Sequence, residues 1–193
     1  FEVKKDEKTI SPDDHWNKKI KANYRAKDDL KIKEKDVKAL RELGLTAVHI
    51  VPEEGIFKGK SDLVILDDDF TSYKKDVAQI IEFKTTGWSD RSYPNSLLGV
   101  IAVIRQTLLD ANWYQKSTQI IEKYPEQNKL IPFPPSLSQL ADFQLNRKPM
   151  LFMTKEEHEA LRALRIVDEF NLSPWLLGSG YEYRSCLLYT SDA

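Results

Sequence analysis

The histidines are the first candidates for chemistry, because imidazole can act as a general base and can bind a catalytic metal. There are three, His15, His49 and His158, and they lack the His-x-His and His-Glu-x-x-His spacings of metal sites. His158 stands among glutamates on a predicted helix, where a solvated side chain is expected. His49 lies inside a predicted strand, which favours a histidine packed in the core or on a sheet face. No Ser-His-Asp set can be assembled from these positions.

A second candidate is the glycine- and lysine-containing segment at residues 55–61, GIFKGKS, which is similar in composition to a phosphate-binding loop. That loop requires G-x-x-x-x-G-K-[ST] followed by a helix. Here Glu54 occupies the first glycine position, and the strand-like residues LVIL follow. The sequence therefore predicts a glycine turn between two strands, shaped by Gly55 and Gly59.

The remaining polar candidates are weaker. The acidic run at residues 67–69 could bind a hard cation, but a polar turn is the expected structure. Arg105 and Gln106 lie partway along an otherwise apolar helix, so they must either find partners or face solvent.

The elements that position these residues follow from the hydrophobic periodicity. Helices are predicted at 34–44, with Val37, Leu40 and Leu43 inward, and at 155–170, with Leu161, Leu164 and Phe170 inward; two more are predicted at 95–124 and 137–145. Strands are predicted at 45–51, 61–66, 148–154 and 174–180. Residues 74–83 fit either a helix or a strand, and a strand is favoured at 80–83. Trp16, Ile20 and Tyr24 recur at helical spacing and are expected to pack residues 1–33 onto the rest of the chain.

The alternation of helix and strand predicts a parallel sheet with crossover helices, starting with the unit formed by 34–44 and 45–51. On pattern alone, an open doubly wound sheet and a (β/α)8 barrel are equally compatible. A 41% hydrophobic chain of this length can form one core. The net charge of −1 argues against a nucleic-acid partner, and no apolar run is long enough to span a membrane.

The ends of the sequence carry separate expectations. Residues 186–193, CLLYTSDA, match the in-frame translation of a sequencing-library adapter, as in a fragment of metagenomic origin. They contain Cys186, the single cysteine, so neither a disulfide nor a cysteine-bound zinc is expected. We therefore expect an approach segment at 1–33, a main domain at 34–185 that is open at both ends, and an artefact at 186–193.

Several stretches in order resemble imidazolonepropionase-like bacterial members of the amidohydrolase superfamily. They are W-N-x-x-I at 16–20, LGLTAVHIVPEEGIFKGKSDLVIL, YPNSLLGVIAVIRQTLLDANWY, RKPMLFMTKEEHEALRALRIVDEF and LLGSGYEYR. The resemblance covers most of residues 14–184. It implies a partial TIM-like (β/α)8 barrel of the metal-dependent hydrolase type, truncated at both ends. It also implies hydrolysis of non-peptide carbon–nitrogen bonds in cyclic or linear amides.

The resemblance further implies one or two divalent metals, with zinc expected. The ligands would be a His-x-His before Phe1, two later histidines, and an aspartate after the adapter junction. At the two later positions this chain has Met153 and either Gly178 or Ser179. A thioether or a hydroxyl is a poor ligand for hydrolytic zinc, so the sequence leaves open whether the chain is an enzyme.

Three functions remain compatible with the sequence. They are an amidohydrolase with a rearranged metal site, a non-catalytic copy beside a second amidohydrolase domain in the full-length chain, and a ligand-binding module. A small-molecule substrate is the expected partner of the hydrolase, whereas the binding module would hold a carbohydrate or a peptide at the barrel mouth. Export to the periplasm is expected from the resemblance. The candidate mouth residues are His49, Glu53, Gly55, Gly59 and Glu182.

Overall fold

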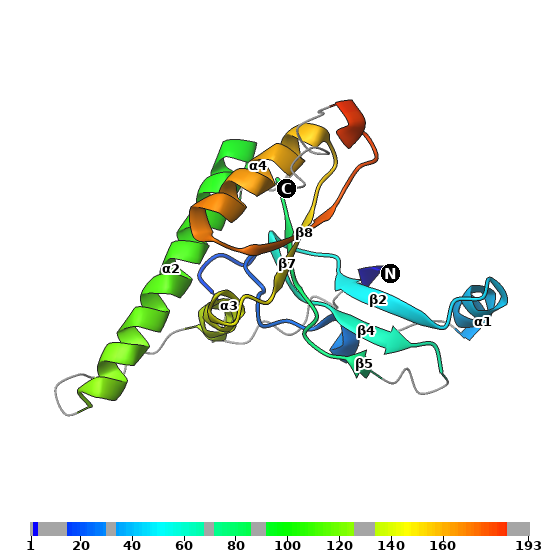
Figure 1. Cartoon of the computed structure of the whole chain (residues 1–193), viewed down its shortest axis with the longest axis horizontal. Coiled ribbons are helices and arrows are strands. Elements are labelled where there is room, and N and C mark those ends of the chain that lie inside the picture. Colours follow the sequence, from blue (N-terminus) through cyan, green and yellow to red (C-terminus); the bar gives the residue numbers. More distant parts are fainter. Residues whose placement is uncertain are drawn as a thin grey trace, which may run out of the picture.

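The computed structural model describes residues 2–3, 15–29, 34–67, 72–85, 92–125 and 134–184, which form a mixed α/β structure. Helices α2, α3 and α4 gather at one end of the molecule, away from strands β2, β4 and β5 (Figure 1). The strands are β1 (Glu2–Val3), β2 (Ala47–Pro52), β3 (Phe57–Lys60), β4 (Asp62–Ile65), β5 (Ser72–Lys74), β6 (Gln79–Glu82), β7 (Pro149–Met153) and β8 (Ser173–Leu177). The helices are α1 (Glu34–Glu42), α2 (Leu97–Lys123), α3 (Pro135–Leu145) and α4 (Glu157–Phe170), with 3-10 turns η1 (Ala26–Asp29) and η2 (Glu182–Arg184).

The first sheet has the order β3-β6-β7-β8, and β6, β7 and β8 are parallel. Helices α2 and α3 connect β6 to β7, and α4 connects β7 to β8. Parallel neighbours require such long crossover connections. This half of the chain therefore has the parallel strands and crossover helices that the sequence predicts.

The second sheet has the order β1-β2-β4-β5. Strands β1 and β2 are parallel, but the predicted strands β2 and β4 are antiparallel, so the prediction of parallel strands is wrong for that pair. Strand β2, predicted to enter a parallel sheet behind α1, instead pairs antiparallel with β4. Only residues 53–61, which include β3, connect β2 to β4, and this is too short for a crossover helix. Short connections therefore impose antiparallel pairing in this half.

The predicted glycine turn at 55–61 is also partly wrong, because Phe57–Lys60 is itself a buried strand. Strand β3 pairs with β6, and after Ser61 the chain enters the other sheet as β4. Ser61 bonds through its backbone N–H and its hydroxyl to the Ala78 carbonyl at 2.9 and 3.1 Å. Residues 57–65 thus form an extended segment shared by both sheets.

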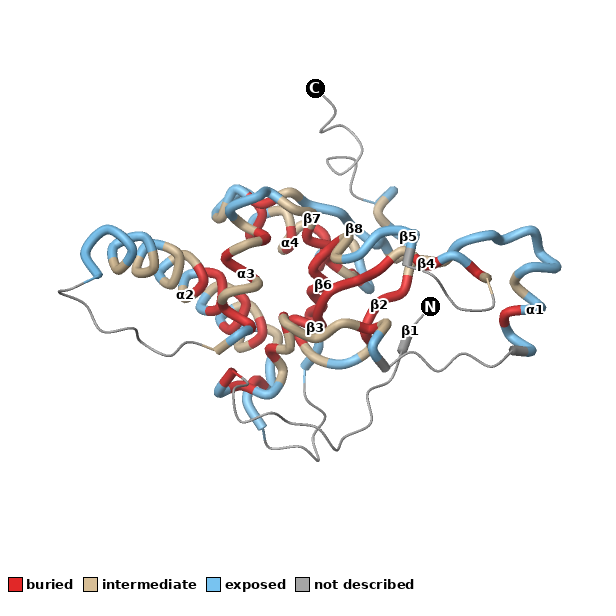
Figure 2. The backbone as a smooth tube through the Cα atoms, turned by 90° about the horizontal axis from the view of Figure 1, so that it is seen from below, coloured by how far each residue is buried: buried red, intermediate tan, exposed pale blue. Residues whose placement is uncertain are grey.

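The main core lies between the helices and one face of the first sheet (Figure 2). Ile81, Phe83 and Phe152 point from the strands toward Val100, Ile104 and Leu108 of α2, with Ala163 and Ile166 of α4 in the same cluster. Helix α2, predicted to begin at residue 95, begins at Leu97 after Ser96, whose hydroxyl accepts a hydrogen bond from the Gly99 N–H at 3.2 Å.

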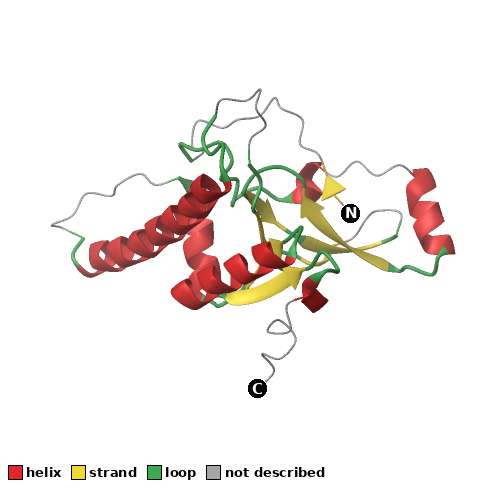
Figure 3. Ribbon diagram, turned by 90° about the horizontal axis from the view of Figure 1, so that it is seen from above, coloured by secondary structure: helices red, strands yellow, loops and turns green. Residues whose placement is uncertain are grey.

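None of the described helices covers the opposite face of the first sheet (Figure 3). Because side chains alternate along a strand, Ile80 and Glu82 occupy this face of β6. Leu151 and Met153 occupy it on β7, where Val51 of β2 packs against them. The described strands do not close into a barrel.

Some predicted packing positions are wrong. Ile20 is buried and Tyr24 partly buried, but Trp16 is 70% exposed and Leu43 is 78% exposed. In α4, Leu161 and Leu164 are only partly buried, whereas Ala160, Ala163, Ile166 and Val167 form the buried stripe. Phe170, also predicted to face inward, is partly buried and packs against the main core. The small alanines let α4 approach the sheet closely, which periodicity alone does not reveal.

Candidate functional site

The carboxyl ends of the three parallel strands meet at one edge of the first sheet. Glu82 pairs in register with Met153, and Met153 pairs with Leu177, so the last residues of β6, β7 and β8 lie side by side. Sheets of parallel strands place their ligands at this edge. It is therefore the first place to look for chemistry.

A buried ion cluster occupies this edge. The Lys58 ammonium lies 2.6 Å from Glu82 Oε2, and the Lys155 ammonium lies 2.8 Å from Oε1 of the same carboxylate. The side chains of Lys58 and Glu82 are 2% and 8% exposed, whereas Lys155 is 66% exposed. Lys58 Nζ also lies 3.5 Å from the thioether sulfur of Met153. One carboxylate thus holds two ammonium groups, one from inside the protein and one from the surface.

The two lysines keep Glu82 ionised. Burial by itself raises the pKa of this carboxyl group, but hydrogen bonds from Lys155 and Lys58 lower it, and the net pKa lies below the ordinary value of 4.5. Ion pairs with little solvent around them are screened weakly, so this cluster is a strong local electrostatic feature.

These residues do not fit a hydrolytic divalent metal. Both oxygens of Glu82 already contact ammonium groups, whose positive charge opposes a second cation at the same place. The Met153 thioether suits soft metals, and Ser179 donates its hydroxyl hydrogen to Glu182 at 3.0 Å. Among the described residues, no three His, Cys, Asp or Glu side chains are grouped so that they could hold a metal ion.

The predicted mouth residues lie on several elements. His49, in β2, is half-buried and contacts the edge of the Trp175 ring on β8 at 6.5 Å between centroids. Burial lowers the pKa of His49, which favours the neutral imidazole at neutral pH. Glu53 and Gly55 lie in the connection between β2 and β3, and Gly59 is buried within β3.

Glu182 lies in η2, beyond the end of β8. Its carboxylate accepts hydrogen bonds from the Ser179 and Gly180 backbone N–H groups at 2.5 and 2.9 Å, and from the Ser179 hydroxyl. Those donors fold the loop after β8 back on itself. Asp67 is the described member of the acidic run; Asp68, Asp69 and residues 186–193 lie outside the described residues.

Sequence reasoning missed Lys58, Glu82 and Lys155. A usable signal exists for Glu82, because a charged residue within the apolar strand QIIEF must find a buried partner. Nothing local identifies that partner, since Lys58 lies far back in the sequence on another strand. The pairing of β3 with β6 brings the two together.

Comparison with known proteins gives a likeness of fold. The structure is similar to the crystal structure of an amidohydrolase from Thermotoga maritima MSB8, with a TM-score of 0.71 and 17% sequence identity. The match covers 83% of this chain and 44% of that one, so the chain spans less than half the length of its structural relative. No family model matches the chain, and no curated protein is a significant match.

The described residues therefore have a mixed α/β fold that resembles part of an amidohydrolase. The likeness is one of fold alone and does not define a substrate or a reaction. Among the described helices, none combines the length and apolar character needed to cross a membrane.

Proposed function

We propose that this chain is an amidohydrolase-like domain without a metal centre of its own, within an imidazolonepropionase-like protein. That protein hydrolyses non-peptide carbon–nitrogen bonds of a small cyclic or linear amide. The metal that activates water, zinc by family resemblance, is held by residues outside this chain, such as those of a second amidohydrolase domain. The sequence resemblance and the likeness of fold support the class of reaction.

One observation carries the non-catalytic part of this proposal. At the carboxyl edge of β6, β7 and β8, the Lys58–Glu82–Lys155 cluster stands where a metal-dependent hydrolase of this architecture needs imidazole and carboxylate ligands. The ammonium groups compensate the negative charge of the ionised Glu82 carboxylate and so stabilise it at that end of the sheet. Met153 completes the cluster as an apolar neighbour of Lys58.

A partial barrel accounts for the two different faces of the first sheet. A segment of a (β/α)8 barrel has helices on one face of its sheet and none on the other. In this sheet the helix-free face carries Ile80, Leu151 and Trp175. Trp175, Leu176 and Leu177 of β8 are 41–51% exposed, which fits a strand that further barrel elements of a longer protein would cover. Export to the periplasm belongs to the same proposal and rests on the sequence resemblance.

We expect the purified 193-residue chain to retain no stoichiometric zinc after equilibration with the metal and dialysis. The reason is that two ammonium groups already compensate the one buried carboxylate at the edge. Metal content by mass spectrometry measures this directly.

The informative variants are His49→Gln and Glu182→Gln, which remove the imidazole and a carboxylate among the candidate residues of the barrel mouth. Stoichiometric zinc in the parent chain that disappears in either variant would establish a rearranged metal site. In that case the chain would be a working metal-dependent hydrolase, and the non-catalytic assignment would be wrong. Zinc bound equally by the parent and both variants would place a metal elsewhere in this chain and would also contradict the proposal.

A further inference from the structure

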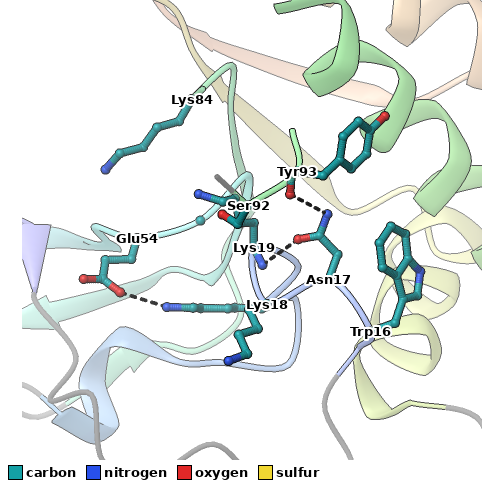
Figure 4. A pocket seen from close by; sticks show the side chains of 10 residues that line it. Trp16, Asn17, Lys18, Lys19, Glu54, Lys84, Ser92 and Tyr93 are labelled. Atoms are coloured by element: carbon teal, nitrogen blue, oxygen red, sulfur yellow. Dashed lines mark hydrogen bonds and ion pairs between the residues drawn. The ribbon is translucent and has the colours of Figure 1, made fainter. Parts of the chain in front are cut away.

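A pocket of about 750 Å³ lies beside the carboxyl end of β6 (Figure 4), and its lining residues do not include Lys58, Glu82 or Lys155. Its volume is in the range of small-molecule sites. Four stretches of chain form it: the N-terminal approach segment, the β2–β3 connection, the residues after β6 and those before α2. The lining residues are Trp16, Asn17, Lys18, Lys19, Lys21, Glu54, Gly55, Lys84, Ser92 and Tyr93.

Backbone contacts hold the walls of this pocket in place. The Lys19 carbonyl accepts a hydrogen bond from the Ile56 N–H at 2.8 Å, and the Lys21 N–H donates to the Phe57 carbonyl at 2.8 Å. The approach segment therefore runs against β3. Gly55 has φ +109°, and a Cβ there would lie 2.8 Å from the Lys19 carbonyl oxygen. The close approach of these two walls thus depends on glycine at this position.

Asn17 connects the approach segment to the loop before α2. It is 5% exposed, its side-chain oxygen accepts from the Lys19 N–H at 3.0 Å, and its amide donates to the Tyr93 carbonyl at 3.4 Å. Figure 4 shows this amide between the lysine side of the pocket and the Trp16 ring. At Asn17 the pocket is therefore lined by a buried amide that two hydrogen bonds hold in place.

The charge of the pocket is strongly positive. Four lysines line it against one glutamate, whereas the whole chain has a formal charge of −1. Glu54 pairs with Lys21 at 2.9 Å. Among the described residues, neither Lys18 nor Lys84 has an ion-pair partner, and both side chains are exposed. A concave site with an excess of ammonium groups attracts anions, because its walls focus the field.

We propose that this pocket binds a small organic anion with at least two negatively charged oxygens, such as a polycarboxylate or a phosphate ester. Lys18 and Lys84 supply the charge that recognises it. Trp16, which is 70% exposed, offers an apolar face in the same pocket for the body of the ligand. The site goes beyond the proposed hydrolase assignment, because its residues take no part in the Lys58–Glu82–Lys155 cluster.

The test is calorimetric titration of the whole chain with citrate and, separately, with pyrophosphate at low ionic strength. The variant Lys18→Gln/Lys84→Gln should bind the preferred anion at least about tenfold more weakly, since each charge-assisted contact contributes to affinity. The matched control is Lys35→Gln/Lys38→Gln on α1, which removes the same charge from exposed positions outside the pocket. The control should bind like the parent.

Preference for citrate would identify carboxylates as the ligand class, and preference for pyrophosphate would identify phosphates; either result supports the site. Equal weakening in both double variants would show attraction by overall charge and would overturn the proposal. Absence of binding of both anions to the parent would overturn it as well. None of these outcomes depends on zinc content, so this site and the hydrolase assignment can fail independently.

Discussion

Replacing Glu82 with glutamine is expected to lower the free energy of unfolding by about 3–5 kcal/mol, because the change leaves a buried lysine without its counter-ion. Lys58 is 2% exposed, so water cannot take the place of the lost carboxylate. Urea denaturation of the 193-residue chain at neutral pH, followed by circular dichroism, measures the loss.

Two variants give the contrast that interprets this result. Glu169→Gln removes an equally short ion pair, 2.6 Å to Arg105, but both partners are more than 40% exposed, so a loss of about 0–1 kcal/mol is expected. Lys58→Met/Glu82→Leu removes both buried charges together and should be considerably more stable than Glu82→Gln. A Glu82→Gln variant as stable as Glu169→Gln would mean that Lys58 is not buried as the structure places it.

The Glu82 carboxylate also determines how the stability of the folded chain changes with pH. Its folded-state pKa lies below the unfolded value, so its contribution to stability is fully present above about pH 4.5. That contribution is lost as the pH falls through the folded pKa. Glu82→Gln should therefore remove part of the acid sensitivity of the parent, measured as the change in the urea midpoint between neutral and acidic pH.

Replacing Gly59 with alanine is expected to cost about 2–4 kcal/mol of unfolding free energy, from backbone strain and a steric clash together. Gly59 has φ +124°, a conformation that L-residues rarely adopt, and a Cβ there would collide with the Tyr24 carbonyl oxygen. Because the obstacle is a backbone carbonyl oxygen, no flexible side chain can move aside to relieve the clash. Thermal unfolding of the two proteins provides the measurement.

Substitutions at two other glycines separate the cost of backbone strain from the cost of the steric clash. Gly44 has φ +84° with nothing within 4 Å of the added Cβ, so Gly44→Ala should cost only about 1 kcal/mol. Gly55→Ala combines φ +109° with a contact to the Lys19 carbonyl at 2.8 Å and should fall between the two. Equal losses at Gly44 and Gly59 would show that the close approach of Tyr24 contributes nothing.

The helical half of the fold could be predicted from the local sequence pattern. The Ser96 cap region and the predicted apolar stripe over Leu97, Ile101, Ile104 and Leu108 are signals within a few turns of chain, so the prediction at 95–124 agrees with α2. The strands at 80–83 and 148–154 were found in the same way. These elements come from periodicities of 3.6 and 2, which each segment carries by itself.

The other half depends on pairing between distant segments. Hydrophobic pattern finds the strand at 45–51, but the short β2–β3 connection and the antiparallel partner β4 decide which sheet it joins. The buried strand FKGK escaped prediction because two lysines and a glycine suggest a turn. Lysine is accommodated at position 58 only because the β3–β6 pairing brings Glu82 beside it.

The same division holds for the candidate sites. The sequence by itself placed Met153 and Gly178 or Ser179 at the strand ends where metal ligands were expected, and it supplied residue types that bind such metals poorly. Tertiary structure alone decided what stands there instead, since Lys58, Glu82 and Lys155 come from three separate elements. The lysine pocket is likewise built from four stretches of chain. Local sequence determines the helix or strand in which a residue lies. The neighbours that bury its side chain and balance its charge are residues far away along the chain, which only the tertiary structure brings beside it.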